Sequence, residues 1–258
     1  MAESPRSLNR SGLPGHTRWV RISHWTITVS FLTLVFTGVL ILMVHPRLYW
    51  GEVGNDLTRP LIELPISRNY HHGGWEGTAA FFEDEASPVT ANRTYEIFNQ
   101  NGWGRSLHFL AGWFLVVSGA IYLLVGIFTG HFRRHMVPRA EELLPRLIWR
   151  DVIDHIHLRI RAANGGPDYG LLQKSAYFSI VFVTLPLIVI TGMTMSPAIT
   201  AAFPFLLDIF GGYQSARTIH FFAFVALILF LLVHVVMIVQ SGFKRQMLGM
   251  ILGVRHEE

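Results

Sequence analysis

The sequence predicts an all-α membrane protein in which four transmembrane helices form one bundle. Two observations lead to this fold class. First, 51% of the 258 residues are hydrophobic and only 15% are charged, which is typical of integral membrane proteins rather than soluble domains. Second, the chain contains four apolar stretches without Lys, Arg, Asp or Glu, each long enough to cross a bilayer as a helix.

The stretches divide the chain into an N-terminal tail, residues 1–21, a single four-helix domain, residues 22–240, and a C-terminal tail, residues 241–258. Pro46 ends the first span, and Pro186 is expected to kink the third, because proline cannot donate a backbone hydrogen bond. The predicted spans are, in order, 22–44, 106–128, 175–196 and 218–240.

The connections differ in charge, and this difference predicts the orientation. Residues 45–105 form a long segment of mixed charge, whereas 129–174 is basic and includes an apolar stripe over 142–163 that predicts an amphipathic surface helix. Most of the 21 Lys and Arg residues lie in the two tails and in 129–174. The positive-inside rule therefore predicts a bacterial inner-membrane protein with both termini cytoplasmic and 45–105 as a periplasmic insertion. The same distribution makes nucleic acid an unlikely reason for the basic charge, and no nucleic-acid partner is expected.

Two histidines lie within the fourth span. His220 and His234 are fourteen residues apart, which places them within roughly 40° of each other on one helix face and about 21 Å apart along the axis. Ionisable side chains inside a span are uncommon and usually functional, and imidazole is a common axial ligand of haem iron. The absence of cysteine excludes thiolate-held iron–sulfur clusters and c-type haem attachment.

Two further histidines lie at matching depths. His24 is at the cytoplasmic mouth of the first span and His108 at the outer mouth of the second. Depth pairs His24 with His234 and His108 with His220, so that each pair could hold one b-type haem. A single histidine in a membrane helix could equally form a hydrogen bond to a neighbouring helix, but four at two matched depths favour two haems. The remaining histidines lie in polar segments and are not expected to bind haem.

Glycines and arginines near these histidines could complete the sites. Gly38 falls fourteen residues after His24, and Gly112 lies four residues after His108, so both could make room for a haem, although ordinary helix packing explains them as well. Four arginines near the proposed ligands could meet haem propionates or could simply report topology. They are Arg18, Arg21, Arg105 and Arg217.

These residues resemble the di-haem cytochrome b family that forms the membrane subunit of bacterial formate dehydrogenase, nickel–iron hydrogenase and thiosulfate reductase. The matching pieces are RISHW, SLHFLAG, QKSAYF, ITG and TIH…LLVH. In the outer segment, PRLYWGEVGNDL and ELPISRN look most like the thiosulfate reductase cytochrome b branch. The resemblance implies the same two histidine pairs as axial ligands of two haem b groups.

The resemblance also implies an exchangeable quinone beside the cytoplasmic-side haem. The corresponding stretch runs from 169 to 174 and includes Gln173 and Lys174. The formate dehydrogenase subunit carries Asn where this sequence has Gly170, so the sequence departs from the family pattern at this quinone contact. A polar helix start at the membrane interface would explain Gln173 and Lys174 equally well.

The expected function is therefore electron transfer between the quinone pool and a periplasmic redox enzyme. The expected partner is a molybdopterin oxidoreductase or a similar enzyme, with or without an iron–sulfur subunit between them. The chain itself is expected to convert no terminal substrate. Three alternatives remain from the sequence. They are a stand-alone cytochrome b that oxidises quinol or handles superoxide, a haem-free membrane anchor, and a transporter, for which only Pro186 offers support.

Overall fold

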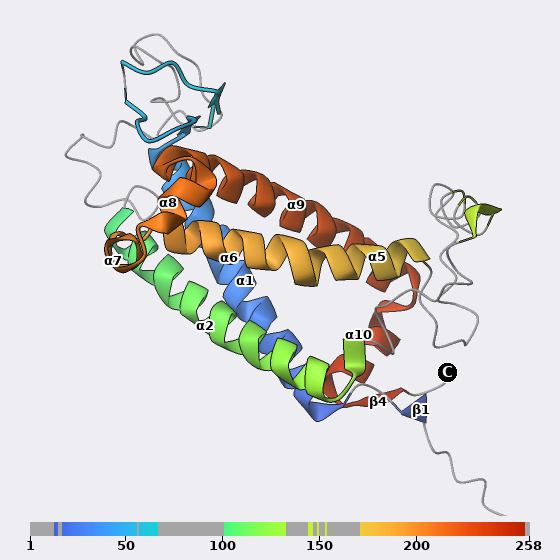
Figure 1. Cartoon of the computed structure of the whole chain (residues 1–258). Helices are drawn as coiled ribbons and strands as arrows, with labels where there is room; N and C mark the ends of the chain where they lie inside the picture. Colours follow the sequence, from blue (N-terminus) through green and yellow to red (C-terminus); the bar gives the residue numbers. More distant parts are fainter. Residues whose placement is uncertain are drawn as a thin grey trace, which may run out of the picture.

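The computed structural model describes residues 13–14, 17–55, 57–66, 101–132, 144–146, 149, 153 and 171–255. Four helical segments in it are long and apolar enough to cross a membrane, which confirms the predicted fold class. They are α1 (Arg18–Val44), α2 (Asn101–Phe128), a third built from α5 (Leu171–Ser179), η6 (Ile180–Thr184) and α6 (Leu185–Thr194), and α9 (Tyr213–Gln240) (Figure 1).

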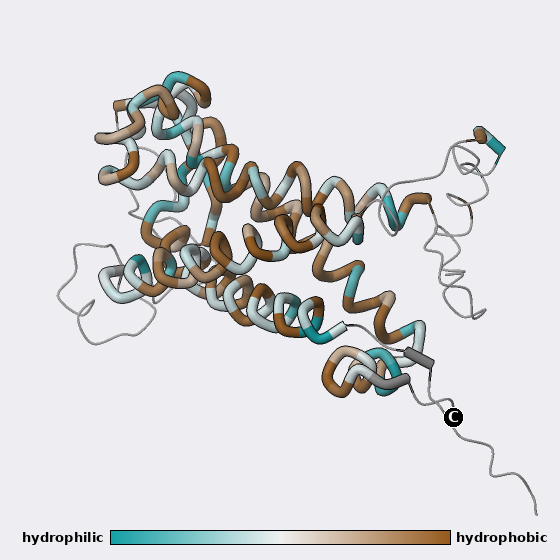
Figure 2. Tube along the Cα trace, turned by 60° about the horizontal axis from the view of Figure 1, so that its bottom comes forward, coloured by the Kyte–Doolittle hydropathy of each residue, from teal (hydrophilic) through white to brown (hydrophobic). Residues whose placement is uncertain are grey.

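The helices form because a lipid-exposed chain must satisfy its backbone hydrogen bonds internally. Their 24 to 28 residues give lengths of about 36–42 Å, enough to cross a hydrocarbon layer of about 30 Å. Large apolar side chains such as Trp113, Phe114 and Val233 remain exposed on them, and Figure 2 shows hydrophobic residues all along the long helices. Such an outward apolar surface is suited to lipid rather than to water.

The third span contains a π-helical turn, η6, directly before Pro186. The Leu185 N–H donates to the carbonyl of Ile180, five residues back, and Pro186 has no N–H to donate to Phe182. The wider turn accommodates the proline, so that α5, η6 and α6 follow one another along one continuous path (Figure 1). The proline's effect on the helix is thus seen as a local π turn.

The bundle consists of two helix pairs. α1 packs mainly against α2, and α9 packs mainly against α6 rather than against α1 or α2. We call the end where α1 begins and α9 ends the tail end, and the end where α1 leads into residues 45–66 the loop end. At the tail end, β1 (Leu13–Pro14) pairs with β4 (Val254–Arg255), so the two tails lie together (Figure 1).

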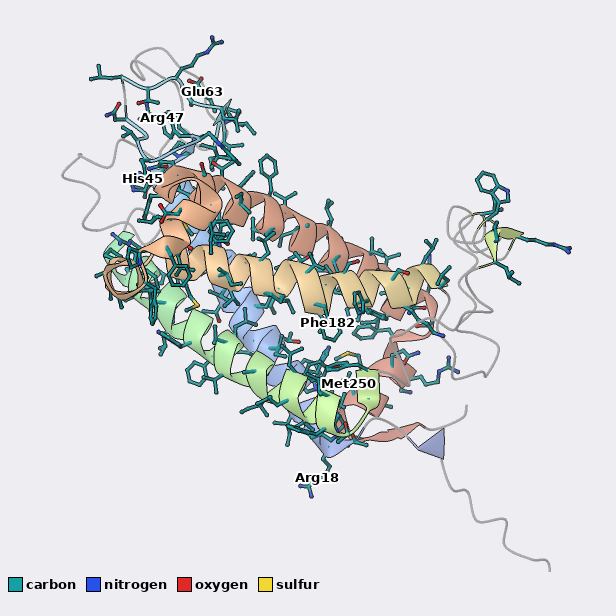
Figure 3. The ribbon with its side chains drawn as sticks, viewed as in Figure 1. Arg18, His45, Arg47, Glu63, Phe182 and Met250 are labelled. Atoms are coloured by element: carbon teal, nitrogen blue, oxygen red, sulfur yellow. The ribbon has the colours of Figure 1, made fainter. Side chains whose placement is uncertain are left out.

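Short elements close both ends of the bundle. At the loop end lie α7 (Pro197–Ala202), α8 (Phe205–Phe210) and the strands β2 (Arg47–Leu48) and β3 (Ile62–Glu63). At the tail end, α10 (Phe243–Ile251) packs near α1, where Trp25 donates from Nε1 to the Met250 carbonyl at 3.3 Å (Figure 3). The four strands are two residues each, so they do not change the all-α class.

The loop after α1 covers the first turn of α9. The Gly51 carbonyl accepts from the backbone N–H groups of Gln214 and Ser215 at 2.9 and 3.2 Å, and the Gly51 N–H donates to Ser215 Oγ at 2.7 Å. Thr218 Oγ1 donates to the Tyr49 carbonyl at 2.6 Å. These bonds satisfy helix-terminal groups that would otherwise lack partners and fix α9 relative to the end of α1.

Two predicted features lie mainly outside the described residues. These are the amphipathic helix over 142–163 and the larger part of the 45–105 insertion, of which 45–55, 57–66 and 101–105 are described.

Candidate functional site

At the loop end, the side chains of His108 in α2 and His220 in α9 meet inside the bundle. Their ring centroids lie 6.4 Å apart and their planes are inclined by 59°. Both residues are half-buried. The structure thus brings together the two histidines that were paired by depth.

Each of these imidazoles also contacts a buried threonine from a helix other than its own. His108 Nδ1 lies 2.9 Å from Thr37 Oγ1 of α1, and His220 Nδ1 lies 3.0 Å from Thr191 Oγ1 of α6. Both threonines are 0% exposed. Sequence reasoning did not single out these threonines, although Thr37 directly precedes Gly38, which it did consider, and Thr191 lies within the ITG piece.

At the tail end, His24 of α1 faces His234 of α9. Their ring centroids are 6.5 Å apart and their planes are inclined by 48°. The ring of His234 also stacks against Phe230, one turn earlier in α9, with centroids 5.7 Å apart and an angle of 16°. Since α9 supplies one histidine to each pair, it carries both sites.

The two pairs fit a haem iron between them. Two imidazoles on opposite sides of a metal, with bonds of about 2 Å, have ring centroids roughly 6 Å apart, close to the 6.4 and 6.5 Å found here. Each pair also joins α9 to the α1–α2 pair, which α9 contacts less closely than it contacts α6. Arg21 Nε, one turn before His24, is buried without a hydrogen-bond partner among the described residues, which suits a propionate.

The other glycines and arginines considered from sequence fall in different places. A Cβ added at Gly38 would lie 3.6 Å from His108 Cε1, whereas one added at Gly112 would meet no other described residue within 4 Å. Arg217 donates to the His45 carbonyl and, at 3.4 Å, to Gln214 Oε1, so it stabilises the loop end (His45 is labelled in Figure 3). Arg18 and Arg105 are exposed.

Comparison with known proteins identifies the family. Residues 15–253 match the family described as prokaryotic cytochrome b561. The chain belongs to that family. It is thus a multi-pass membrane electron-transfer protein of the cytochrome b type, and the family implies haem b.

A curated relative of this cytochrome b comes from Azospira oryzae. It is named “Putative protein-methionine-sulfoxide reductase subunit YedZ1” and is 29% identical over 239 residues, which cover 92% of this chain and 96% of the relative. No solved structure is significantly similar to the chain.

Near the tail-end pair, a row of side chains leads from the start of the third span to His234. Gln173 Nε2 donates to the Tyr177 hydroxyl oxygen at 3.2 Å, and the Tyr177 ring meets Phe230 edge to face at 5.9 Å. Phe230 in turn stacks on His234. Lys174, beside Gln173, is buried with 4% of its surface exposed. Sequence reasoning gave no role to Tyr177, which lies within QKSAYF, or to Phe230, although each lies four residues, one helical turn, from a residue it named.

His131, expected not to bind haem, lies elsewhere in this cytochrome b. Its ring is at the tail end, edge to face with Trp19 at 5.4 Å and 5.9 Å from the Phe132 ring. Within the described parts of the chain, no group of three or more His, Cys, Asp or Glu side chains could hold a separate metal ion.

Proposed function

We propose that this cytochrome b holds two haem b groups, one between His24 and His234 and the other between His108 and His220. The observation that carries the proposal is the approach of two imidazole pairs at two depths, with ring centroids 6.5 and 6.4 Å apart. Each haem, when bound, supplies a one-electron carrier. The pairs share α9, where their ligands are about 21 Å apart along the axis, so the two sites together reach across most of a hydrocarbon layer.

We propose that a quinone exchanges electrons at the tail end, beside His234. The hydrogen bond from Gln173 to Tyr177 and the contact of Tyr177 with Phe230 support this location, because they connect polar groups at the membrane edge with the side chain stacked on a haem ligand. The buried Lys174 lies in the same region, beside Gln173. Gln173 and Lys174 would orient a quinone carbonyl, and Tyr177 would line its ring.

The excess of Lys and Arg in the tails and in 129–174 supports an orientation with the tail end facing the cytoplasm. The protein would then lie in the bacterial inner membrane with both termini cytoplasmic. The loop end, including residues 45–66, would face the periplasm and meet the redox partner.

The partner would be a periplasmic oxidoreductase, either of the molybdopterin type or similar, with or without an iron–sulfur subunit between them. The relative's name refers to a subunit of a protein-methionine-sulfoxide reductase, which favours electron flow from quinol to the partner. Quinol oxidation releases two electrons and two protons, and reduction of a sulfoxide to a thioether and water consumes the same number. The likeness of PRLYWGEVGNDL to the thiosulfate reductase branch leaves a sulfur oxyanion as a second candidate substrate of the partner.

Purified protein tests the haem proposal directly. A reduced-minus-oxidised spectrum with a haem-to-protein ratio should give two b haems per chain. His220→Ala should remove the loop-end haem and leave one, because His234 and His24 remain. Gln214→Ala, in the same helix but outside both pairs, serves as the matched control and should retain both.

Three outcomes would contradict the proposal or part of it. A colourless wild-type protein produced with ample haem would instead support an anchor or a transporter. Retention of both haems by His220→Ala would show that this ligand is misassigned. Rapid quinol oxidation by the isolated chain with oxygen or superoxide, without any partner, would favour the stand-alone alternative.

A further inference from the structure

We propose that the two Thr–Gly dipeptides, Thr37–Gly38 in α1 and Thr191–Gly192 in α6, position the loop-end histidines and lower the reduction potential of the loop-end haem. We call each dipeptide a seat. The inference rests on the proposed function, since it assigns the hydrogen-bond partners of His108 and His220. Each seat lies on a helix next to the one that carries its histidine. The two dipeptides occur in different spans, and each places a threonine hydroxyl next to a glycine, which has no side chain to fill the space beside it.

The direction of the hydrogen bonds follows from the number of protons. A threonine hydroxyl carries one proton. Thr37 Oγ1 donates to the Thr33 carbonyl at 2.8 Å, and Thr191 Oγ1 donates to the Leu187 carbonyl at 2.7 Å. A carbonyl cannot donate, so these bonds and the contacts to His108 and His220 coexist only if each imidazole donates from Nδ1–H to the hydroxyl oxygen.

This arrangement fixes which ring nitrogen can bind a metal. With the proton held on Nδ1, the lone pair of each imidazole is on Nε2. Both loop-end histidines would therefore hold the tautomer that leaves Nε2 free to bind a haem iron. Thr37 and Thr191 are both completely buried, so water does not compete for these bonds.

The glycine in each seat lets the imidazole come close to the neighbouring helix. A Cβ at Gly192 would lie 3.3 Å from His220 Cε1 and 3.7 Å from its Nδ1, and a Cβ at Gly38 would lie 3.6 Å from His108 Cε1. A larger side chain at either position would move the ring away from the threonine beside it. The hydroxyl and the adjacent glycine thus act together on one imidazole.

The tail-end pair is built differently. His234 packs its ring against Phe230, and within the described residues no hydroxyl is bonded to its Nδ1. An acceptor on Nδ1–H makes an imidazole a stronger electron donor to its metal, which stabilises ferric iron over ferrous iron. The seats should therefore lower the potential of the loop-end haem only.

Potentiometric titration of the complete protein, monitored by visible absorption, tests this inference. The loop-end wave is identified as the one absent from His220→Ala. Thr191→Val and Thr37→Val keep the side-chain shape but remove the acceptor, and each should weaken the preference for ferric iron by about tenfold, which is a rise of about 59 mV for one electron. Thr191→Ser and Thr37→Ser keep the hydroxyl and should restore the wild-type value.

Thr194→Val is the matched control. Thr194 lies in α6, is 0% exposed and donates to the Ile190 carbonyl at 2.9 Å, but no imidazole is among its partners in the described residues. It should leave both potentials unchanged. A valine variant that loses the loop-end haem still supports the inference on two conditions. The loss must be confined to the loop-end haem, and the matching serine variant and Thr194→Val must both retain two haems.

Unchanged loop-end potentials in both valine variants would overturn the inference, and so would an equal shift of the tail-end wave or the same shift in Thr194→Val. These results are distinct from a failure of the proposed function, in which the wild-type protein itself would lack two haems.

Discussion

Replacing Gly192 with alanine is the most discriminating small change near the loop-end pair. The new methyl carbon would lie 3.3 Å from His220 Cε1, slightly inside ordinary van der Waals contact. The neighbour must move by a few tenths of an ångström, and His220 cannot move freely because Thr191 holds its Nδ1 at 3.0 Å. The substitution should therefore disturb the imidazole rather than the fold.

The size of the effect can be worked out from comparison with neighbouring glycines. Overpacking in a tight interior costs about 1–3 kcal/mol, and a contact this slightly short belongs at the lower limit. A loss of about 1 kcal/mol weakens haem binding at the loop end by about fivefold. Gly38→Ala, with its contact at 3.6 Å, should have a smaller effect, and Gly102→Ala, which would meet no described residue within 4 Å, should have none.

Haem release from the purified variants into excess apomyoglobin measures this order. The expected ranking of loop-end haem release is Gly192→Ala first, then Gly38→Ala, with Gly102→Ala equal to wild type. The reasoning is refuted if Gly192→Ala behaves like Gly102→Ala, or if Gly38→Ala has the larger effect. The same assay on Gly112→Ala tests whether that glycine packs against the haem, since no described residue would obstruct the methyl group.

Two further predictions concern the ends of the bundle. Thr218→Val removes a buried 2.6 Å bond to the Tyr49 carbonyl, so thermal unfolding should show a loss of about 1–3 kcal/mol. Thr33→Val, at an exposed hydroxyl, is the control, and equal melting temperatures for the two variants would contradict the role of this bond. Tyr177→Phe removes the acceptor of the Gln173 amide and should raise KM for quinol about three- to tenfold with haem content unchanged. An unaltered kcat/KM would argue against a quinone beside Tyr177.

Much of this fold is readable from the sequence because lipid imposes simple rules. Four uncharged apolar stretches required four spans, and the fourteen-residue interval between His220 and His234 put both on one face at two depths. The same depth argument predicted the two histidine pairs that approach each other in the structure. These features depend on helix geometry alone, so no tertiary information was needed.

Other parts of the site depend on how separate helices face one another. The contact of Thr37 with His108 joins residues 71 positions apart, and a buried threonine in a membrane helix usually bonds only its own backbone. The path from Tyr177 to Phe230 likewise depends on the rotation of the third span against α9. The π turn at Ile180–Thr184 changes that rotation, and a proline in the sequence specifies only that some adjustment is needed.

The single helix α9 supplies half of the ligands to both proposed haems, and this has a consequence for how the protein can evolve. The thirteen residues between His220 and His234 are all apolar. Apart from the buried Ala223 and Leu227 and from Phe230, which stacks on His234, their identities can drift among similar side chains. The number of residues between the two histidines cannot change in the same way, because one inserted or deleted residue would rotate one imidazole by about 100° relative to the other. In this stretch, selection should therefore act on length far more strongly than on composition.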